Sequence, residues 1–412
     1  MSDVIIFEDY AWRNFLPLTY WRPVFRLRCG RYPLMERLSA ELPAKLTGLW
    51  VREEIADVTA SRHGLPVNQR AAPGAVLLNA RWLPMSGHVA QQIEAAPCPG
   101  VGMLGDEVAY IRCDDKLAAA LGAGDLLDAD RTCEALDSLP RVPAKGLMID
   151  FPWDLVSHNG DLLLYDWDPA AAKIEGTVQP GAHLINERSV HIGEGSVVKS
   201  GAVLDADEGP IYIGENVTIM PNAVVCGPTF IGDDTVISAG AWIRTNVSIG
   251  PGCRIGGEVG ASIIHALANK QHHGFLGHSY VAEWVNIGAG TTTSNLKNTY
   301  GEIKVPVCGV PTDTGQTFVG SIIGDFAKTG INQSLATGSV IGFGSSLATS
   351  SINSPFVPSF RFVTDRKDEP YDPQRCLEVA QRSMARRKIT ISPQEQEYFR
   401  QLPALAAHHE SL

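Results

Sequence analysis

Pairs of isoleucine and glycine recur through the C-terminal half of this chain, mostly at multiples of six residues. The pairs begin at Ile192, Ile213, Ile231, Ile249, Ile255, Ile287, Ile323 and Ile341. From Ile213 onward, every interval except that between Ile255 and Ile287 is a multiple of six. Chance is the alternative in a chain with 40 glycines, but the shared spacing argues against it. A fixed period of this kind restricts the region to a repeat architecture.

Six-residue segments fold as a left-handed parallel β-helix when three of them form one triangular turn. One apolar side chain per segment then points inward, and a small or turn-forming residue occupies each corner. At 18 residues per turn, the stretch from about Val190 to Gly344 gives roughly eight stacked turns. The interval between Ile255 and Ile287 and the stretch 297–316 break the period, so we expect loops at both places.

The N-terminal part lacks this period and alternates short apolar runs with helical patterns. Residues 4–7 and 75–78 are typical of buried strands, and residues 115–122 and 131–139 of helices. This alternation predicts an α/β layered domain over residues 1–180. The β-helix domain then covers residues 181–355.

Residues 356–412 are expected to form a helical tail that packs on the end of the solenoid, because terminal turns need a cover. One helix is predicted over residues 372–387, with Pro373 in its first turn. A second helix follows Ser392, which forms a capping box with Glu395.

Charge and cysteine content restrict the function classes. A formal net charge of −11 argues against a general nucleic-acid or anionic-membrane binder, because both need a basic face. The eight cysteines show no C-x-x-C spacing, so neither a zinc site nor a disulfide framework is predicted. The N-terminal sequence does not resemble a signal peptide, and no apolar run is long enough to span a bilayer. We therefore expect a cytoplasmic protein.

The first candidate site lies between Lys270 and Lys297, where histidines, asparagines, a lysine and small residues occur together. Acyl transfer to an amine needs a base that works near neutral pH and polar donors for the developing oxyanion. His272, Asn286 and Asn295 supply groups of these kinds, and we expect the stacked turns to bring them to one cleft. The structural alternative is that the histidines pack and the asparagines form corner turns.

The motif Asn286-Ile-Gly-Ala-Gly-Thr, with Asn295 nine residues after the first asparagine, resembles a known acetyltransferase domain. It is similar to the C-terminal half of the bifunctional bacterial enzymes that make UDP-N-acetylglucosamine, the GlmU-like family. That family joins a uridylyltransferase domain to a left-handed β-helix. The resemblance implies acetyl-CoA as co-substrate and a homotrimer with acyl sites between subunits.

Site residues follow from the same resemblance. It implies that His272 is the catalytic base, while Asn286 and Asn295 hold the amino sugar and the acetyl donor. It also implies that the Ala289 backbone lies at the thioester, Ser321 near coenzyme A and Lys297 at a phosphate. The family has tyrosines where this chain has Phe275 and Leu296. Only Arg244 or Arg254 could replace the basic residues that the family carries one turn earlier.

The second candidate site is a run of six arginines between Arg13 and Arg37. Guanidinium groups match phosphate geometry, so Arg13, Arg22 and Arg26 are candidate ligands of a nucleotide or sugar phosphate. A surface face with salt bridges is the alternative.

This segment, together with Asn79-Ala-Arg81-Trp and Asp150-Phe-Pro-Trp-Asp154, resembles a divergent branch of the sugar nucleotidyltransferases. Ordinary members have a glycine-rich phosphate loop after the first strand, and residues 7–13 here contain no glycine. Either the arginines replace the loop or the activity is lost. Asp106 and Asp154 are candidate Mg²⁺ ligands, because this ion prefers carboxylates and phosphate oxygens.

Three hypotheses follow. In the first, the front domain transfers a uridylyl group and the solenoid transfers an acetyl group. In the second, only one half is active and the other is a scaffold. In the third, the protein is a non-enzymatic module that binds a sugar nucleotide and a partner.

Overall fold

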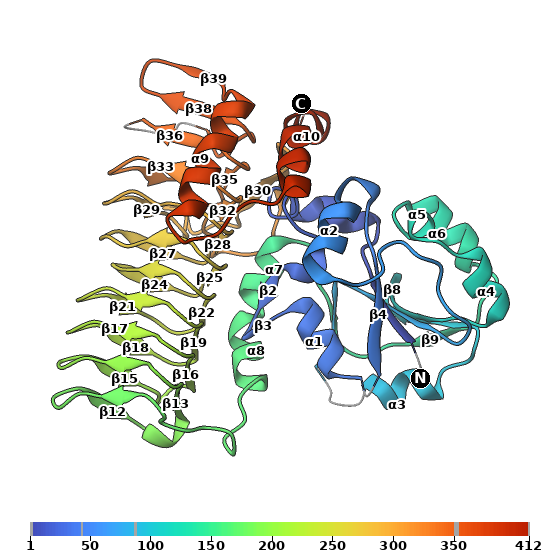
Figure 1. The fold of residues 1–412 in the computed structure, drawn as a ribbon, viewed down its shortest axis with the longest axis horizontal. Coiled ribbons are helices and arrows are strands. Elements are labelled where there is room, and N and C mark those ends of the chain that lie inside the picture. The colour runs from blue at the N-terminus through green and yellow to red at the C-terminus, as the bar shows by residue number, and fades with distance from the viewer. Residues whose placement is uncertain (1–2, 43, 86–88, 350–353, 411–412) are drawn as a thin grey trace. The chain divides into compact units, whose positions relative to one another are not determined.

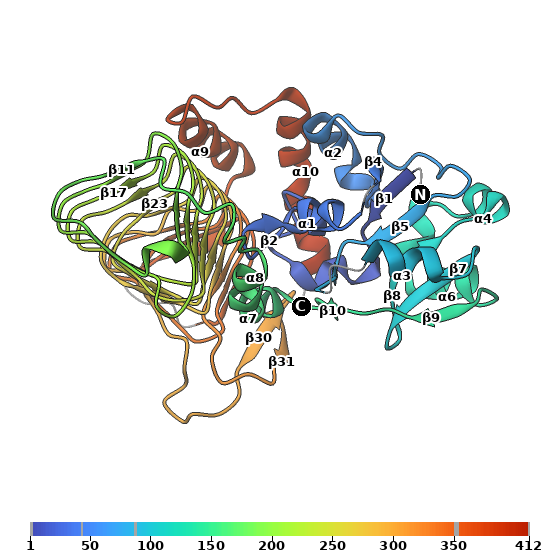
Figure 2. The same cartoon turned by 90° about the horizontal axis from the view of Figure 1, so that it is seen from below.

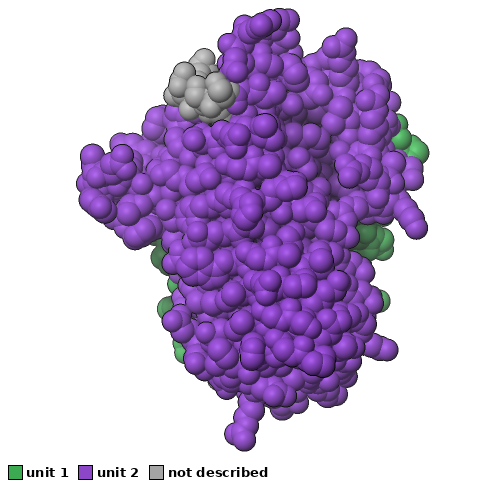
Figure 3. Space-filling view, turned by 90° about the vertical axis from the view of Figure 1, so that its left-hand side faces the viewer, with its two compact units in different colours: residues 1–28, 32–151, 392–398 green, residues 29–31, 152–391, 399–412 purple. Residues whose placement is uncertain are grey.

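The computed structural model describes residues 3–42, 44–85, 89–349 and 354–410. The chain forms two compact units, which Figure 3 distinguishes by colour. Unit 1 comprises residues 1–28, 32–151 and 392–398, and unit 2 comprises residues 29–31, 152–391 and 399–412. Residues 152–180, which the sequence assigned to the front domain, therefore belong to the unit that contains the solenoid.

Unit 1 is built on a six-stranded mixed sheet. In spatial order its strands are β4 (Lys45–Trp50), β1 (Asp3–Phe7), β5 (Val76–Asn79), β8 (Glu107–Arg112), β7 (Gly100–Leu104) and β9 (Arg141–Pro143). Strand β1 is parallel to both β4 and β5, whereas β8 is antiparallel to β5 and β7. The apolar run of β1 is buried and packs in the unit 1 core, as its composition predicts.

Short helices and two-residue strands complete unit 1. The α-helices are α1 (Leu34–Ala40), α2 (Ala56–His63), α3 (Val89–Ala95), α4 (Asp115–Ala120), α5 (Ala123–Leu126) and α6 (Ala129–Leu136). The 3₁₀ helices are η1 (Tyr10–Phe15), η2 (Val24–Arg26) and η3 (Glu53–Ile55). Strands β6 (Trp82–Leu83) and β10 (Leu147–Met148) form an antiparallel pair, and β2 (Arg28–Cys29) and β3 (Tyr32–Pro33) are also short. The α/β layering predicted from the sequence is confirmed.

Unit 2 is a three-sided parallel β-helix, and Figure 2 views its triangular outline from one end. The first face contains β11 (Thr177–Val178), β14 (Val197–Val198), β17 (Thr218–Ile219), β20 (Val236–Ile237), β23 (Arg254–Ile255) and β26 (Asn269–Lys270). The same face continues with β33 (Lys328–Thr329), β36 (Ser346–Ala348), β38 (Arg361–Thr364) and the antiparallel β39 (Asp368–Pro370). Bridges of Asn286 to Asn269 and to Lys328 join the two series.

The other two faces follow the same pattern of stacked short strands (Figure 1). The second contains β12 (His183–Ile185), β15 (Val203–Asp205), β18 (Val224–Cys226), β21 (Trp242–Ile243), β24 (Glu258–Gly260) and β27 (Phe275–Gly277), with β29 (Thr292–Thr293) and β34 (Ser334–Leu335) pairing beyond them. The third contains β13 (Val190–Ile192), β16 (Ile211–Ile213), β19 (Thr229–Ile231), β22 (Val247–Ile249), β25 (Ile263–Ile264), β28 (Tyr280–Val281), β32 (Ile322–Ile323), β35 (Val340–Ile341) and β37 (Phe356–Val357).

Isoleucine, valine, leucine and alanine side chains fill the interior of the prism, as the repeat predicts. Several corners carry asparagine in the left-handed backbone region, including Asn216 (φ 54°), Asn222 (φ 61°) and Asn246 (φ 62°). Asparagine tolerates this conformation better than most side chains. The solenoid runs from β11 to β38 and therefore extends beyond the expected residues 190–344 at both ends.

One of the two expected loops is absent and the other is present. Arg254, Asn269 and Asn286 pair in successive turns, so the interval between Ile255 and Ile287 contains two turns that are shorter than the regular repeat. The expectation of a loop there was wrong, because the β-helix accepts shorter corners without leaving its register. Residues 297–316 do leave the solenoid and contain the hairpin of β30 (Lys304–Val307) and β31 (Val310–Asp313).

Helices α7 (Pro152–Ser157) and α8 (Asn159–Tyr165) and the 3₁₀ helix η4 (Glu187–Ser189) lie in unit 2 before and within the first turns. The tail forms α9 (Pro373–Ala385) and α10 (Pro393–Glu410), both close to the predicted positions. The capping box before α10 is confirmed, with reciprocal hydrogen bonds of 2.8 and 3.2 Å between Ser392 and Glu395. Among the described residues, no helix is long and apolar enough to cross a membrane.

Candidate functional site

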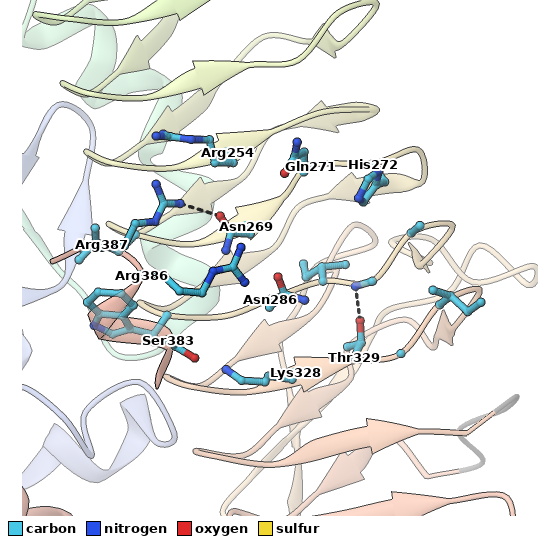
Figure 4. A pocket seen from close by; sticks show the side chains of 17 residues that line it. Arg254, Asn269, Gln271, His272, Asn286, Lys328, Thr329, Ser383, Arg386 and Arg387 are labelled. Carbon is cyan, nitrogen blue, oxygen red and sulfur yellow. Dashed lines mark hydrogen bonds between the residues drawn. The ribbon is translucent and has the colours of Figure 1, made fainter. Parts of the chain in front are cut away.

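A pocket of about 720 Å³ opens on the first face of the solenoid (Figure 4). We call it the solenoid pocket. Its lining residues are Arg254, Leu267, Asn269, Gln271, His272, Trp284, Asn286, Ile287, Gly288, Ala289, Lys328, Thr329, Gly330, Ile331, Ser383, Arg386 and Arg387. The volume lies within the range of small-molecule sites. The pocket therefore joins successive turns of the β-helix to the end of α9.

Four polar side chains form a column along one edge of this face. Arg254, Asn269, Asn286 and Lys328 pair with one another in that order through parallel strand positions in successive turns. Neighbouring strands of a sheet lie about 4.8 Å apart, so each side chain stands directly beside the next. The column results from register rather than from a contiguous motif.

His272 occupies the corner that follows β26, and its side chain is exposed. The buried Lys270 fixes this corner, because its Nζ donates hydrogen bonds to the carbonyl oxygens of Gly256 (2.8 Å) and His272 (3.0 Å). Burial lowers the pKa of Lys270 to about 8, although Glu258 acts in the opposite direction. The corner that bears the His272 imidazole is thus hydrogen-bonded to the preceding turn through Lys270.

Asn286 and Ala289 also line the pocket, as the resemblance implies. The Asn286 backbone is held in the ladder, where its N–H donates to Ala327 (3.0 Å) and its carbonyl accepts from Thr329 (3.0 Å). Its exposed side chain is directed toward the pocket in Figure 4. The Ala289 carbonyl accepts a hydrogen bond from Asn332 (2.7 Å), which places this corner firmly on the next turn.

The pocket is strongly cationic. Arg254, Lys328, Arg386 and Arg387 line it, whereas no aspartate or glutamate of the described chain does. Burial lowers the pKa of Arg387, and the positive charges of Arg254 and Arg386 lower it further. Burial also lowers the pKa of Lys328. Burial is the main cause for both groups, and repulsion from neighbouring cations contributes at Arg387.

Asn295 does not line the pocket, so within one chain the structure does not bring it to the cleft of His272 and Asn286. Their meeting across subunits of an oligomer stays a prediction. Asn295 follows β29 on the second face, where its Nδ2 lies 2.9 Å from Nδ1 of His278. The His278 ring stacks on Phe318 with a centroid distance of 5.2 Å. Burial lowers the pKa of His278, and the charge of Arg244 lowers it further.

Ser321 and Lys297 also lie away from the pocket lining. Ser321 is fully buried, and its hydroxyl lies 2.9 Å from that of Ser339 in the next turn. Lys297 lies in the insertion, and its ammonium donates to the carbonyl of Glu302. Neither side chain therefore lines the pocket that contains His272 in the same chain.

In unit 1, the three arginines proposed to bind phosphate differ in exposure and in their partners. Arg13 is exposed, with its guanidinium carbon 5.6 Å from the centroid of the Trp12 ring. Arg22 is buried, and Arg26 forms an ion pair with Glu36. None of the three lines the cavity described below.

The segment that replaces the glycine-rich loop is closed by buried ion pairs. Glu8 accepts hydrogen bonds from Arg52 at 2.8 and 2.9 Å, and both residues are buried. Burial raises the pKa of Glu8 although Arg52 opposes this effect. Backbone N–H groups that would cradle a phosphate are replaced here by side-chain contacts within the unit.

Arg81 forms a second buried ion network after β5. Its side chain has no solvent exposure and contacts Asp9 (2.6 Å), Glu107 (2.6 Å) and Asp150 (2.5 Å). Burial by itself lowers the pKa of Arg81, but the three carboxylates together raise it above its usual value. The guanidinium thus holds together three acidic groups at the carboxyl ends of β1 and β5, where open α/β sheets usually bind ligands.

A cavity of about 90 Å³ lies beside this network. Asp9, Tyr10, Asp106 and Glu107 line it together with mainly apolar side chains. Among the described residues, no group of three or more histidine, cysteine, aspartate or glutamate side chains is arranged to hold a metal ion. Asp106 belongs to unit 1 and Asp154 to unit 2. Mg²⁺ binding by Asp106 and Asp154 stays a prediction.

Sequence reasoning missed three of the four pocket cations. Only Arg254 was named as a possible basic substitute, whereas Lys328, Arg386 and Arg387 were not identified. The sequence offered one signal for these two arginines, because the Arg386-Arg387 pair lies at the end of a predicted helix. Its role depends on contact with Asn269, 118 positions earlier in the chain, which no local pattern reveals.

Comparisons with known proteins agree with the two-part architecture. Residues 4–173 match the sugar nucleotidyl transferase family. Residues 210–245 match six repeats of the bacterial transferase hexapeptide family. The first match covers unit 1 almost completely, and the second covers turns of the solenoid that precede the pocket.

Curated relatives are bifunctional GlmU proteins. That of Synechococcus elongatus is 29% identical over 195 residues, which is 46% of this chain and 39% of the relative. The protein of Rippkaea orientalis is 27% identical over 55% of this chain and 50% of the relative. That of Methanococcus maripaludis is 28% identical over 60% of this chain and 54% of the relative. The chain thus spans from about two fifths to half the length of these relatives.

One solved structure, an Arabidopsis UDP-N-acetylglucosamine acyltransferase, aligns with 57% of this chain and 91% of its own. Its identity of 13% and TM-score of 0.23 are too low to inform on function. The two family matches place a sugar nucleotidyl transferase region before hexapeptide repeats in this chain. The chain thus joins a region that matches the sugar nucleotidyl transferase family to a β-helix that contains bacterial transferase hexapeptide repeats, and it is similar to GlmU proteins over about half of its length.

Proposed function

We propose that the solenoid transfers an acetyl group from acetyl-CoA to the amino group of a sugar phosphate, as in UDP-N-acetylglucosamine-type synthesis. The observation that carries this proposal is the shared pocket of His272 in one turn of the β-helix and of Asn286 and Ala289 in the next turn. The similarity to GlmU proteins supports the same chemistry. The cytoplasm, which contains acetyl-CoA and sugar phosphates, is the proposed compartment.

In the proposed reaction, His272 accepts a proton from the ammonium group of the acceptor. The free amine then attacks the thioester carbonyl carbon, so that a C–N bond forms and the C–S bond breaks. The departing thiolate takes up a proton and leaves as coenzyme A thiol. A positioned base of this kind contributes about 10²- to 10⁴-fold to the rate.

Asn286 and Ala289 would orient the reactants beside His272. The carboxamide of Asn286 can both donate and accept hydrogen bonds, which suits a neutral contact with the sugar or the thioester. Asn295, Ser321 and Lys297 lie elsewhere in the chain, so we propose that a homotrimer brings these groups of a neighbouring subunit to the site. This arrangement rests on the resemblance to the family.

The proposal is tested by thiol release from acetyl-CoA in the presence of glucosamine 1-phosphate. His272→Ala should lower kcat by about 100-fold or more. His273→Ala is the matched control, because His273 adjoins His272 but lines a separate depression with Trp242 and Phe275. Equal activity of His272→Ala and the wild type, or absence of thiol release with any amino-sugar acceptor, would contradict the proposal.

A second proposed activity is Mg²⁺-dependent uridylyl transfer from UTP by unit 1, in which the ion would neutralise phosphate charge. The match of residues 4–173 to sugar nucleotidyl transferases supports it. Arg13, Arg22 and Arg26 are its proposed phosphate contacts. Formation of UTP from UDP-N-acetylglucosamine and pyrophosphate, with and without Mg²⁺, is the direct measurement. Loss of this activity in Arg13→Gln would support a phosphate role for the exposed guanidinium.

The competing proposal for unit 1 is sugar-nucleotide binding without turnover. The buried pairs of Glu8 with Arg52 and of Asp9 with Arg81 favour it, because they replace the phosphate loop by closed side-chain contacts. Calorimetry with UDP-N-acetylglucosamine would then detect binding, while pyrophosphorolysis stays at background. Turnover by the wild type would exclude this alternative.

A further inference from the structure

The end of α9 contributes two arginines to the solenoid pocket. Arg386 and Arg387 follow the last turn of this helix and line the pocket opposite the stacked turns. Nη2 of Arg387 donates a hydrogen bond of 2.8 Å to Oδ1 of Asn269 in the polar column. Figure 4 shows Arg254, Arg386 and Arg387 at one side of the pocket and His272 at the other, with Asn286 between them.

Packing of α9 on the solenoid fixes this position. Its buried residues are Cys376, Leu377, Ala380 and Met384, and they form an apolar face. Sγ of Cys376 lies 3.4 Å from the carbonyl oxygen of Gly344. A side chain at Gly344 would come within 2.8 Å of this sulfur, so the approach is close. Apolar contacts of α9 thus pack it on the solenoid independently of the arginines at its end.

The charge of the pocket is not balanced by the protein. Among the described residues, Arg254, Lys328, Arg386 and Arg387 form no ion pair with an acidic side chain, although the chain carries a net charge of −11. A helix C-terminus favours a nearby cation, which explains one arginine at this end of α9. It does not explain why two further cations from separate turns of the β-helix point to the same space.

We propose that the solenoid pocket binds a phosphate-bearing ligand through Arg386 and Arg387 of α9 and Arg254 of the β-helix, and that α9 is thus part of the binding site. Guanidinium groups bind phosphate through paired, charge-assisted hydrogen bonds. Lys328 adds a point charge at the end of the polar column. Phosphate binding in this pocket does not depend on the acyl-transfer proposal. The orientation of the ligand's reacting group toward His272 rests on that proposal.

Two sources of the phosphate fit this chemistry. A sugar phosphate would place its phosphate at the arginines and its amine toward His272. Acetyl-CoA would place its phosphates there and its thioester toward His272. Both ligands carry a phosphate and a reacting group, so binding measurements have to choose between them. Inorganic pyrophosphate carries only the shared anionic group and serves as a minimal probe.

Calorimetry on the full chain, with pyrophosphate, glucosamine 1-phosphate and coenzyme A as separate ligands, tests the proposal. The double variant Arg386→Gln/Arg387→Gln should weaken binding by about 10-fold or more, because charge-assisted hydrogen bonds are lost. Arg382→Gln is the matched control. Arg382 lies on the same helix, its side chain is 76% exposed, and it does not line the pocket.

The three ligands distinguish the sources. Weakened binding of glucosamine 1-phosphate assigns the site to the acceptor, and weakened binding of coenzyme A assigns it to the donor. Affinity should also fall as salt rises, because the contacts are ionic. If the double variant binds all three ligands as the wild type does, or if none of them binds the wild type at millimolar concentration, the proposal is overturned.

Thermal melting and thiol-release measurements distinguish a loss of phosphate binding from a loss of folding and from a failure of the acyl-transfer proposal. The double variant should melt without ligand at the same temperature as the wild type or slightly higher, because repulsion among like charges is relieved. A purely structural role would instead lower the melting temperature. His272→Ala should retain phosphate binding. Arginine-dependent binding without any thiol release would therefore contradict the acyl-transfer proposal while leaving the binding site in place.

Discussion

Nζ of Lys270 donates a hydrogen bond to the carbonyl oxygen of His272 over 3.0 Å, and a second bond of 2.8 Å reaches Gly256 in the preceding turn. The lysine is 3% exposed, so the ammonium is buried inside the corner whose outer side carries the imidazole. A buried cation therefore supports the proposed catalytic base through the backbone. This arrangement couples the stability of the corner to pH.

Lys270 predicts a specific pH dependence of stability. Its pKa is about 8 in the folded protein and 10.5 ordinarily, so the unfolded chain binds more protons between these values. The free energy of unfolding should rise with pH across this window, by up to about 3 kcal/mol from this group. Lys270→Met lacks the titrating group and should show a smaller rise.

Urea unfolding at several pH values between about 7 and 10 measures this difference. Other groups titrate in the same range, so the comparison between the two proteins is the informative quantity. Identical pH dependence of the wild type and Lys270→Met would show that burial does not shift the lysine.

Arg81→Met should destabilise unit 1. The substitution leaves the buried carboxylate of Asp9, and those of Glu107 and Asp150, without their shared cation. Removing one member of a buried ion pair costs about 3–5 kcal/mol. Urea unfolding followed by circular dichroism gives the loss. The exposed Arg131 of α6 provides the control, and Arg131→Met should stay within about 0.5 kcal/mol of the wild type.

Gly288→Ala should distort the solenoid pocket. A Cβ at Gly288 would lie 2.0 Å from the carbonyl oxygen of Gly330 in the next turn, so the backbone has to move. We expect a loss of about 2 kcal/mol or more, together with weaker ligand binding. Gly240 has φ of 67° and no neighbour within 4 Å of its Cβ position. Gly240→Ala should therefore cost only about 1 kcal/mol from backbone strain.

Thermal melting and calorimetry on both glycine variants provide the test. Equal losses for the two substitutions would mean that backbone conformation, rather than contact between the turns, dominates at Gly288.

Mixed oligomers test whether Asn295 serves a neighbouring subunit. His272→Ala and Asn295→Ala should each be inactive in thiol release. If the site is shared between subunits, co-expression of the two variants should restore about one quarter of the wild-type activity per site, because some interfaces receive both intact residues. The physical basis is that Asn295 contacts His278 and does not line the pocket of His272.

Sedimentation of the co-expressed sample has to show that the two variants are in one oligomer. Activity that stays at the level of the single variants in such mixed oligomers would place both residues in one subunit's site, or exclude Asn295 from the reaction.

Local patterns predicted much of the fold. The apolar strand at residues 4–7, the helix with Pro373 in its first turn and the capping box of Ser392 with Glu395 depend on neighbouring residues. The loop expected between Ile255 and Ile287 was wrong because two turns are shortened at their corners. Counting residues detects a change in spacing, but it does not distinguish an insertion from a shorter turn.

The candidate site was predicted only in part. His272, Asn286 and Ala289 line one pocket, and these residues come from the motif region. The arginine run between Arg13 and Arg37 looked like a phosphate site, yet Arg22 is buried and Arg26 pairs with Glu36. Local spacing cannot show which way each side chain points when the segment consists of turns and 3₁₀ helices.

The sequence by itself determined the β-helix, because each six-residue segment directs its apolar residue inward whatever the partner in the neighbouring turn. Only the tertiary structure decided the composition of the pocket. Register in successive turns aligned Arg254, Asn269, Asn286 and Lys328, whose spacings are irregular in sequence. The apolar face of α9 then brought Arg387 to Asn269. Such contacts depend on burial between distant segments, and no local periodicity encodes them.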